Sequence, residues 1–271
     1  MRLGGKKLKG ATIAVSGKGG VGKTSLAALL IRRLSQIGSV LAIDADPDSN
    51  LPQALGVTVR KSIGHVRESI IDAPARSKTI MTREEFVRLT LHEVIEEFAE
   101  FDIVVMGRSE ESGCYCFLNN IIRQVIDFRA RSYDFTVIDC HAGLEHLSRR
   151  TTKGVDVLIV VTEPTKNGML TARRVIELSR ELSIDIGTIM VVANKVSPGI
   201  KPLLDKTARE NGLEVDVCIP FEEEIAHLSI LGKPVVNLST DSPLSAAVGR
   251  VYERIMAYST TSIEAMISEP R

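Results

Sequence analysis

The sequence of 271 residues has no net charge, no long apolar run and only four cysteines. Its 34 Lys and Arg balance 34 Asp and Glu, so composition offers no electrostatic argument for nucleic-acid binding. No apolar stretch approaches the ~18 residues that a membrane span requires, and no charged start precedes an apolar signal core. Four cysteines do not suggest a disulfide framework and fit free or metal-bound thiols. We therefore expect a cytoplasmic protein that binds neither nucleic acid nor membrane.

The pattern of apolar residues predicts one α/β domain. Hydrophobic residues make up 44% of the chain and charged residues 25%, which suits a substantial core. Strand-like runs alternate with helical periodicity, as in a three-layer sandwich whose mostly parallel sheet carries helices on both faces. The expected strands are 12–16, 39–43, 102–106, 134–138, 155–161, 188–193 and 214–219. The expected helices are 23–37, 84–99, 117–130, 166–183, 201–211, 222–231 and 242–257.

No linker or repeat divides the chain, so we treat residues 1–271 as a single domain. The stretch 60–82 is polar and fits neither periodicity. We expect residues 258–271 to form a frayed tail.

The most informative segment fits the phosphate-loop pattern of Gly, four residues, Gly, Lys and Ser or Thr. It consists of Gly17, Lys18, Gly19, Gly20, Val21, Gly22, Lys23 and Thr24. Glycines let the loop wrap a pyrophosphate with its amides pointing inward, and the following helix adds its positive N-terminal end. We expect Lys23 to neutralise the β- and γ-phosphates, Thr24 to ligate Mg²⁺ and Ser25 to lie in the same site. The segment predicts a nucleotide-binding phosphate loop of a P-loop NTPase.

Lys18 narrows the class. The string Lys-Gly-Gly-Val-Gly-Lys-Thr resembles the deviant Walker A loop of the ATPase family that includes the septum-site and plasmid-partitioning ATPases and the nitrogenase iron protein. The resemblance implies that Lys18 reaches the nucleotide of a second subunit, so that a homodimer forms and hydrolysis depends on it. The alternative is a solvated loop lysine.

Three carboxylates follow predicted strands, where ligands of open α/β sheets bind. They are Asp44, Asp46 and Asp139, in segments that resemble the two switches of this family. The resemblance implies that Asp46 orients the attacking water, Asp44 lies near the magnesium shell and Asp139 holds Mg²⁺ through water. It also implies that the Gly143 amide contacts the γ-phosphate. Any single Asp after a strand can instead form a turn or cap, the role we assign to Asp48.

Asn194 and Lys195 end another predicted strand. A guanine site would continue as Asn-Lys-x-Asp, but Ser197 stands at the last position. The resemblance then implies that Asn194 contacts adenine and that the backbone near Pro220 completes the pocket, which favours ATP over GTP. The alternative for Asn194 is a loop residue that caps a helix.

Cys114 and Cys116 form a Cys-x-Cys pair after a glycine-rich, charged segment. On extended backbone, thiols at i and i+2 project to the same side and can bind one soft ion. A tetrahedral site needs four ligands, and a two-fold dimer would supply the other pair. The alternative is two small buried hydrophobes. Cys218 lies in a strand run, where we expect core, and the role of Cys140 stays open.

Two longer strings sharpen the resemblance. Met-Gly-Arg-x-Glu followed by Gly-Cys-Tyr-Cys, and His-Ala-Gly-Leu-Glu-His-Leu-Ser-Arg-Arg-Thr after Asp-Cys, are similar to the nickel-insertion ATPases of the CooC/AcsF type. The resemblance implies a metallochaperone that hydrolyses ATP to ADP and delivers Ni²⁺ to carbon monoxide dehydrogenase or acetyl-CoA synthase. Zn²⁺ competes for the same thiolates. Many relatives have Asp-Thr-x-Ala-Gly where this chain has Asp-Cys-His-Ala-Gly, which leaves a metal or proton role for His141 open.

Two other functions use similar parts. An iron–sulfur scaffold or electron-donating ATPase would also use four thiolates between subunits, but the chain lacks a second cysteine motif at matching spacing. A septum-site positioning ATPase would need a basic amphipathic C-terminal helix, and residues 258–271 contain one Arg and two Glu.

Overall fold

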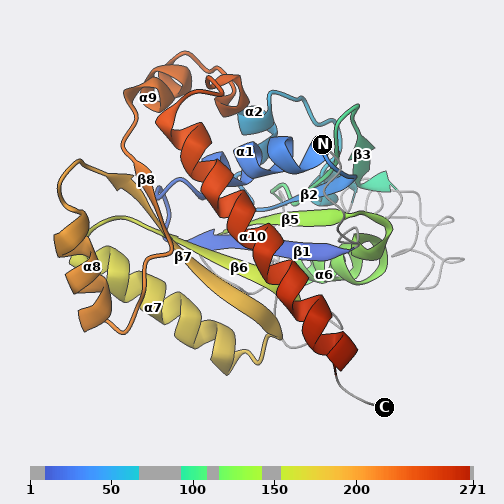
Figure 1. Cartoon of the computed structure of the whole chain (residues 1–271). Helices are drawn as coiled ribbons and strands as arrows, with labels where there is room; N and C mark the ends of the chain where they lie inside the picture. The colour runs from blue at the N-terminus through green and yellow to red at the C-terminus, as the bar shows by residue number, and fades with distance from the viewer. Residues whose placement is uncertain (1–9, 67–92, 109–115, 142–153, 269–271) are drawn as a thin grey trace, which may run out of the picture.

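The computed structural model describes residues 10–66, 93–108, 116–141 and 154–268. They form an eight-stranded sheet in the order β3-β4-β2-β5-β1-β6-β7-β8, which crosses the middle of the molecule with helices above and below it (Figure 1). The strands are β1 (Ala11–Gly17), β2 (Val40–Ala45), β3 (Ile95–Glu97), β4 (Asp102–Val105), β5 (Phe135–Cys140), β6 (Val155–Thr162), β7 (Ile186–Val196) and β8 (Val217–Pro220). All pairs are parallel except β3–β4, which confirms the predicted α/β class.

Helices cover both faces of the sheet. They are α1 (Lys23–Ser35), α2 (Leu51–Leu55), α6 (Cys116–Arg129), α7 (Lys166–Glu181), α8 (Lys201–Glu210), α9 (Glu223–Ile230) and α10 (Pro243–Ser268). Side chains of α1, α2 and α10 pack in one core cluster and those of α6, α7 and α8 in the other. Residues along β1 alternate between them, with Ile13 and Val15 in the first and Ala14 in the second. Strands covered on both faces are nearly continuous apolar runs, and every residue of β1 is buried, including the polar Thr12 and Ser16.

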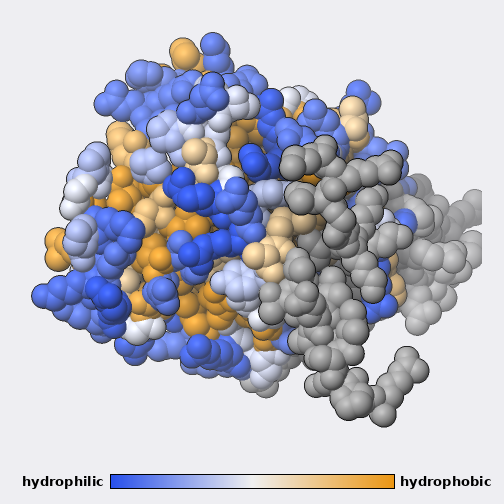
Figure 2. Space-filling model, in the orientation of Figure 1, coloured by the Kyte–Doolittle hydropathy of each residue, from blue (hydrophilic) through white to orange (hydrophobic). Residues whose placement is uncertain are grey.

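Apolar side chains reach the surface on one face of the molecule. Apolar side chains gather between α10 and the helices α7 and α8, over β7 and β8 (Figure 2). A cavity of about 540 Å³ lies there, lined by residues that include Ile176, Leu213 and Tyr258. No helix within the described ranges combines the length and the apolarity that a membrane span needs.

The seven predicted strands and six of the seven predicted helices are present. The helix predicted over 84–99 is wrong at its C-terminal part, because Ile95–Glu97 forms β3. This strand pairs antiparallel with β4, Ile95 opposite Val104, and Phe98 and Phe101 at the turn stack with ring centroids 5.7 Å apart. Pairing with an open sheet edge outweighs the local helical pattern. Residues 84–92 lie outside the described residues.

In the segment where we expected a frayed tail, α10 continues to Ser268. No Gly or Pro occurs between Arg250 and Pro270, so nothing in the local sequence ends the helix earlier. The described part of the helix extends to Ser268, two residues before Pro270.

Candidate nucleotide-binding site

The phosphate loop connects the end of β1 to the start of α1. Gly17 and Gly22 have positive φ values of 145° and 94°, a region that favours glycine. A Cβ at Gly17 would overlap the carbonyl oxygen of Val161, and one at Gly22 would overlap the Asn194 side chain. Among the described residues no side chain caps α1, so its first N–H groups are available to an anion. The loop thus has the geometry expected of a phosphate cradle.

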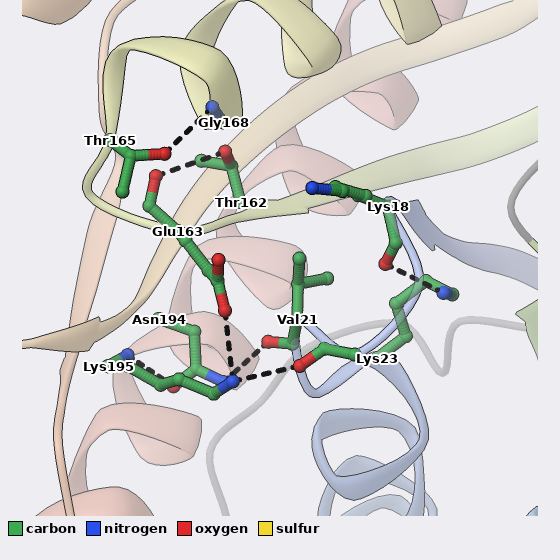
Figure 3. A network of polar contacts seen from close by, with 10 residues as sticks. Lys18, Val21, Lys23, Thr162, Glu163, Thr165, Gly168, Asn194 and Lys195 are labelled. Atoms are coloured by element: carbon green, nitrogen blue, oxygen red, sulfur yellow. Dashed lines mark hydrogen bonds and ion pairs between the residues drawn. The ribbon is translucent and has the colours of Figure 1, made fainter.

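The two lysines of the loop differ in their surroundings. Lys23 is buried, and its Nζ donates a hydrogen bond to the Lys18 carbonyl at 3.1 Å. The Lys18 side chain is exposed and extends away from Lys23 (Figure 3). A buried ammonium is costly without a counter-ion, so Lys23 is placed to meet an anion in the loop, whereas Lys18 is free to reach outward.

Asp44 and Asp139 lie side by side, as register partners at the ends of β2 and β5. Both are buried. Asp44 accepts hydrogen bonds from the backbone N–H groups of Asp46 at 3.1 Å and Leu51 at 2.9 Å. Asp139 accepts a hydrogen bond from the Thr24 side chain, while its buried Oδ1 has no hydrogen-bond partner among the described residues. Beside the phosphate loop, one oxygen of the Asp139 carboxylate is therefore not hydrogen-bonded to any described residue.

Burial raises the pKa of both carboxyls. The pKa of Asp44 rises to about 8, through burial first and then the neighbouring Asp139 charge. Burial raises the pKa of Asp139 to about 6, against the opposing effects of Thr24 and Lys23. Near neutral pH the pair therefore retains a proton, which a divalent cation can replace. Carboxylate and hydroxyl oxygens suit a hard cation, so Asp44, Asp139 and Thr24 fit the predicted Mg²⁺.

The first switch segment continues from Asp44 to Asp48. The Asp46 side chain is half-buried and accepts a hydrogen bond from the Asp48 backbone N–H at 2.9 Å. Asp48, predicted only to be a turn or cap residue, forms an ion pair with Arg108, which lowers the pKa of the Asp48 carboxyl. His141, at the start of the second switch, is exposed and adds to this lowering.

Asn194 and Lys195 hold the other side of the phosphate loop (Figure 3). The Asn194 Nδ2 donates to the Val21 carbonyl at 2.8 Å, and its Oδ1 accepts from the Lys195 backbone N–H at 2.8 Å. Lys195 has a φ of 59° at a register irregularity of β7. Its Nζ donates to the Gly20 carbonyl at 2.9 Å and to Glu163 Oε1 at 3.0 Å.

This arrangement makes Asn194 a loop-positioning residue, and its predicted contact with adenine stays a prediction. Pro220 ends β8 and is half-buried. The sequence analysis missed Lys195 and Glu163 as loop contacts. The Asn-Lys pair at the end of a predicted strand could have indicated a site role for Lys195. No local sequence pattern indicates such a role for Glu163.

The predicted thiol pair lies largely beyond what can be described. Cys114 and Gly143 fall outside the described residues, and Cys116 is the first residue of α6, with only its backbone described. Within the described part of the chain, no group of three or more His, Cys, Asp or Glu could hold a metal. Cys140 is fully buried in the core. Cys218, which we expected in the core, is half-buried and packs against the same core cluster.

Comparisons with known proteins agree with this geometry. The family described as the CobQ/CobB/MinD/ParA nucleotide binding domain matches residues 12–235. The chain is 47% identical to an uncharacterized ATP-binding protein, MJ0685, of Methanocaldococcus jannaschii, over 90% of this chain and 98% of that protein. It is 32% identical to the carbon monoxide dehydrogenase accessory protein CooC of Rhodospirillum rubrum, over 84% of this chain and 90% of that protein.

The fold also matches solved structures. The septum site-determining protein MinD of Pyrococcus horikoshii, complexed with Mg-ADP, superposes with a TM-score of 0.64 at 23% identity, over 90% of this chain and 94% of that one. The cell division ATPase MinD of Pyrococcus furiosus superposes with a TM-score of 0.67 at 21% identity, over 92% of this chain and 99% of that one.

Proposed function

Because the chain belongs to the CobQ/CobB/MinD/ParA nucleotide-binding family, we propose that it is an ATP-dependent metallochaperone. In this proposal the protein is a nucleotide-switched homodimer. It binds Ni²⁺ through Cys114 and Cys116 of both subunits and delivers the ion to carbon monoxide dehydrogenase or acetyl-CoA synthase.

The ATPase part rests on one observation, the buried Asp44–Asp139 pair beside Lys23 and Thr24. Lys23 binds the β- and γ-phosphates, and Thr24, Asp44 and Asp139 would hold a Mg²⁺ ion that would further neutralise the phosphate charge. Asp46, held by the Asp48 amide, orients the attacking water. Positioning of this kind supplies most of the catalysis in phosphoryl transfer.

The dimer part rests on the exposed Lys18 side chain. A lysine that extends away from its own loop can neutralise the phosphates of a second subunit, and hydrolysis then requires dimerisation. The same two-fold symmetry brings two copies of each cysteine together, which is the number of thiolates that a tetrahedral site needs.

The metal and the client come from similarity. The relative named as a carbon monoxide dehydrogenase accessory protein shares 32% identity over most of both chains. The motif that contains Cys114 and Cys116 gives this chain two soft ligands that suit nickel. Thiolates must be deprotonated to bind, so metal affinity falls as the pH is lowered.

Metal analysis of the purified protein tests the proposal. We expect one Ni²⁺ per dimer, no iron and no visible absorbance band of an iron–sulfur cluster. The double variant Cys114→Ala/Cys116→Ala should lose the metal and keep ATP binding, and Cys218→Ala, which removes a thiol elsewhere, should keep both. One metal per chain that persists in the double variant would remove the main support for a metallochaperone.

A further inference from the structure

The loop that follows β4 lies beside the first switch. In the sheet, β2 separates β4 from β5 and β1, so the neighbour of the β4 loop at this edge is the β2 loop. The two backbones stay paired one residue beyond the end of β4, because the Met106 N–H donates to the Asp44 carbonyl at 2.9 Å. The sheet therefore places the segment leading to the cysteines next to the first switch, with the phosphate loop two strands further away.

Arg108 and Asp48 join these two loops through their side chains. The Arg108 guanidinium pairs with the Asp48 carboxylate, and the Asp48 backbone N–H is bound to Asp46 Oδ1. The approach of the β4 loop is fixed at Gly107, whose φ is 69° and where a Cβ would overlap Ser62. Asp48 is thus attached to the proposed water-orienting residue on one side and to the β4 loop on the other.

The exposure of this pair suits a reversible link. The side chains of Arg108 and Asp48 are 73% and 56% exposed. An ion pair this exposed contributes little to folding stability, so it can form and break without disturbing the core. Among the contacts described above, it is the side-chain ion pair that connects the loop after β2 to the loop after β4.

We propose that the Asp48–Arg108 ion pair transmits the nucleotide state of the first switch to residues 106–108, the described part of the loop after β4, which precedes Cys114 and Cys116 in the sequence. This inference rests on the proposed function and adds a positioning residue, Arg108, that acts through Asp48. When Asp46 moves toward the γ-phosphate, the backbone of Asp48 moves with it, and Arg108 follows its partner or loses it. The β4 loop then differs between the ATP-bound and ADP-bound forms.

Hydrogen exchange of the full-length protein tests the link without any metal. Amides of residues 104–108 are compared with Mg-ADP and with a non-hydrolysable Mg-ATP analogue in the wild type, Arg108→Gln and Arg108→Lys. The matched control is Glu177→Gln, which breaks the similarly exposed Arg173–Glu177 pair on α7 (52% and 44%). We expect a nucleotide-dependent difference in the wild type and the control, its loss in Arg108→Gln, and its partial retention in Arg108→Lys.

A second measurement uses Ni²⁺ affinity in the same two nucleotide states. The wild type should show a change of about 5-fold or more, in the usual range of coupling between sites. Arg108→Gln should bind Ni²⁺ equally in both states, with an affinity like that of the wild type without nucleotide. Failure of the wild type to bind Ni²⁺ would refute the proposed function, and the exchange data would still decide the link.

Three results would overturn the inference. The first is a wild type without nucleotide-dependent exchange at 104–108. The second is an Arg108→Gln protein that responds as the wild type does. The third is equal loss in Arg108→Gln and Arg108→Lys, because a retained positive charge at this position should preserve part of the ion pair.

Discussion

The two sides of the phosphate loop are built in different ways. On the side of the carboxylate pair, Lys23, Asp44 and Asp139 are buried, and their charges act on one another through protein. On the side of Asn194, Lys195 and Glu163 meet at 3.0 Å with both side chains partly exposed. Charges in a low-dielectric interior interact strongly, whereas exposed pairs are screened by water and salt. Substitutions should therefore have large effects on the first side and small effects on the second.

The largest effect is expected for hydrolysis in Asp46→Ala. This variant should bind Mg-ATP with near wild-type affinity and lose turnover, because only the orientation of the attacking water is removed. We expect a fall of about 100-fold or more in kcat, in the range of a lost positioned acid–base group. Phosphate release and equilibrium binding of ATP measure the two properties. Equal loss of nucleotide affinity and turnover would contradict the role of Asp46.

Lys23→Ala should instead lose nucleotide binding. Removing the buried partner of a phosphate costs about 2–5 kcal/mol of binding free energy, as for other buried charge pairs. Calorimetric titration with ADP measures it. Lys18→Ala is the matched control, which should bind nucleotide as a monomer and dimerise less with a non-hydrolysable ATP analogue. A Lys18→Ala protein that dimerises like the wild type would make Lys18 an ordinary loop lysine.

The next effect concerns pH and the carboxylate pair. Folding raises both pKa values from 3.8, to about 8 for Asp44 and about 6 for Asp139. The stability that comes from proton binding is complete below about pH 4 and is lost as the pH rises toward 8. Without Mg²⁺, Asp139→Asn should therefore gain on the order of 1–3 kcal/mol of unfolding free energy relative to the wild type between pH 5.5 and 8.

Urea unfolding in chelator at several pH values measures this difference. With Mg-ADP the order should reverse, because the cation needs the carboxylate and its affinity should fall about 10- to 100-fold in the variant. A variant less stable than the wild type at pH 8 without Mg²⁺ would contradict the raised pKa of Asp139.

The smallest effect is expected on the Asn194 side of the phosphate loop, at Lys195 and Glu163. Lys195→Ala and Glu163→Gln each remove one half of an exposed pair that supports the loop carbonyl of Gly20. ADP affinity should change by no more than about 1 kcal/mol, the upper range for exposed ion pairs. Competition binding measures it. A loss as large as that of Lys23→Ala would erase the difference between the two sides.

Local patterns predicted the parts of the molecule that local chemistry decides. The glycines that frame the phosphate loop, the acids at the ends of β2 and β5 and the apolar parallel strands all follow from residue type and position. β3 could not be predicted in this way, because residues 95–97 become a strand through pairing with β4. Likewise, Asp48 and Arg108 are 60 positions apart, and only the strand order brings them together.

The extent of α10 has a different explanation. The prediction of a frayed tail rests on its terminal position, whereas the absence of Gly and Pro between Arg250 and Pro270 allows the helix to continue. A terminal position does not end a helix by itself, and no helix-breaking residue occurs between Arg250 and Ser268.

The central claim is that nucleotide binding and metal binding at the two cysteines are coupled. The most direct test is whether nucleotide and Ni²⁺ change each other's affinity. Affinity for a non-hydrolysable Mg-ATP analogue is measured with and without Ni²⁺, and affinity for Ni²⁺ with and without the analogue. The account predicts that each ligand changes the affinity of the other by the same factor, and that Cys114→Ala/Cys116→Ala abolishes the effect. Nucleotide affinity that is the same with and without bound Ni²⁺ would contradict it.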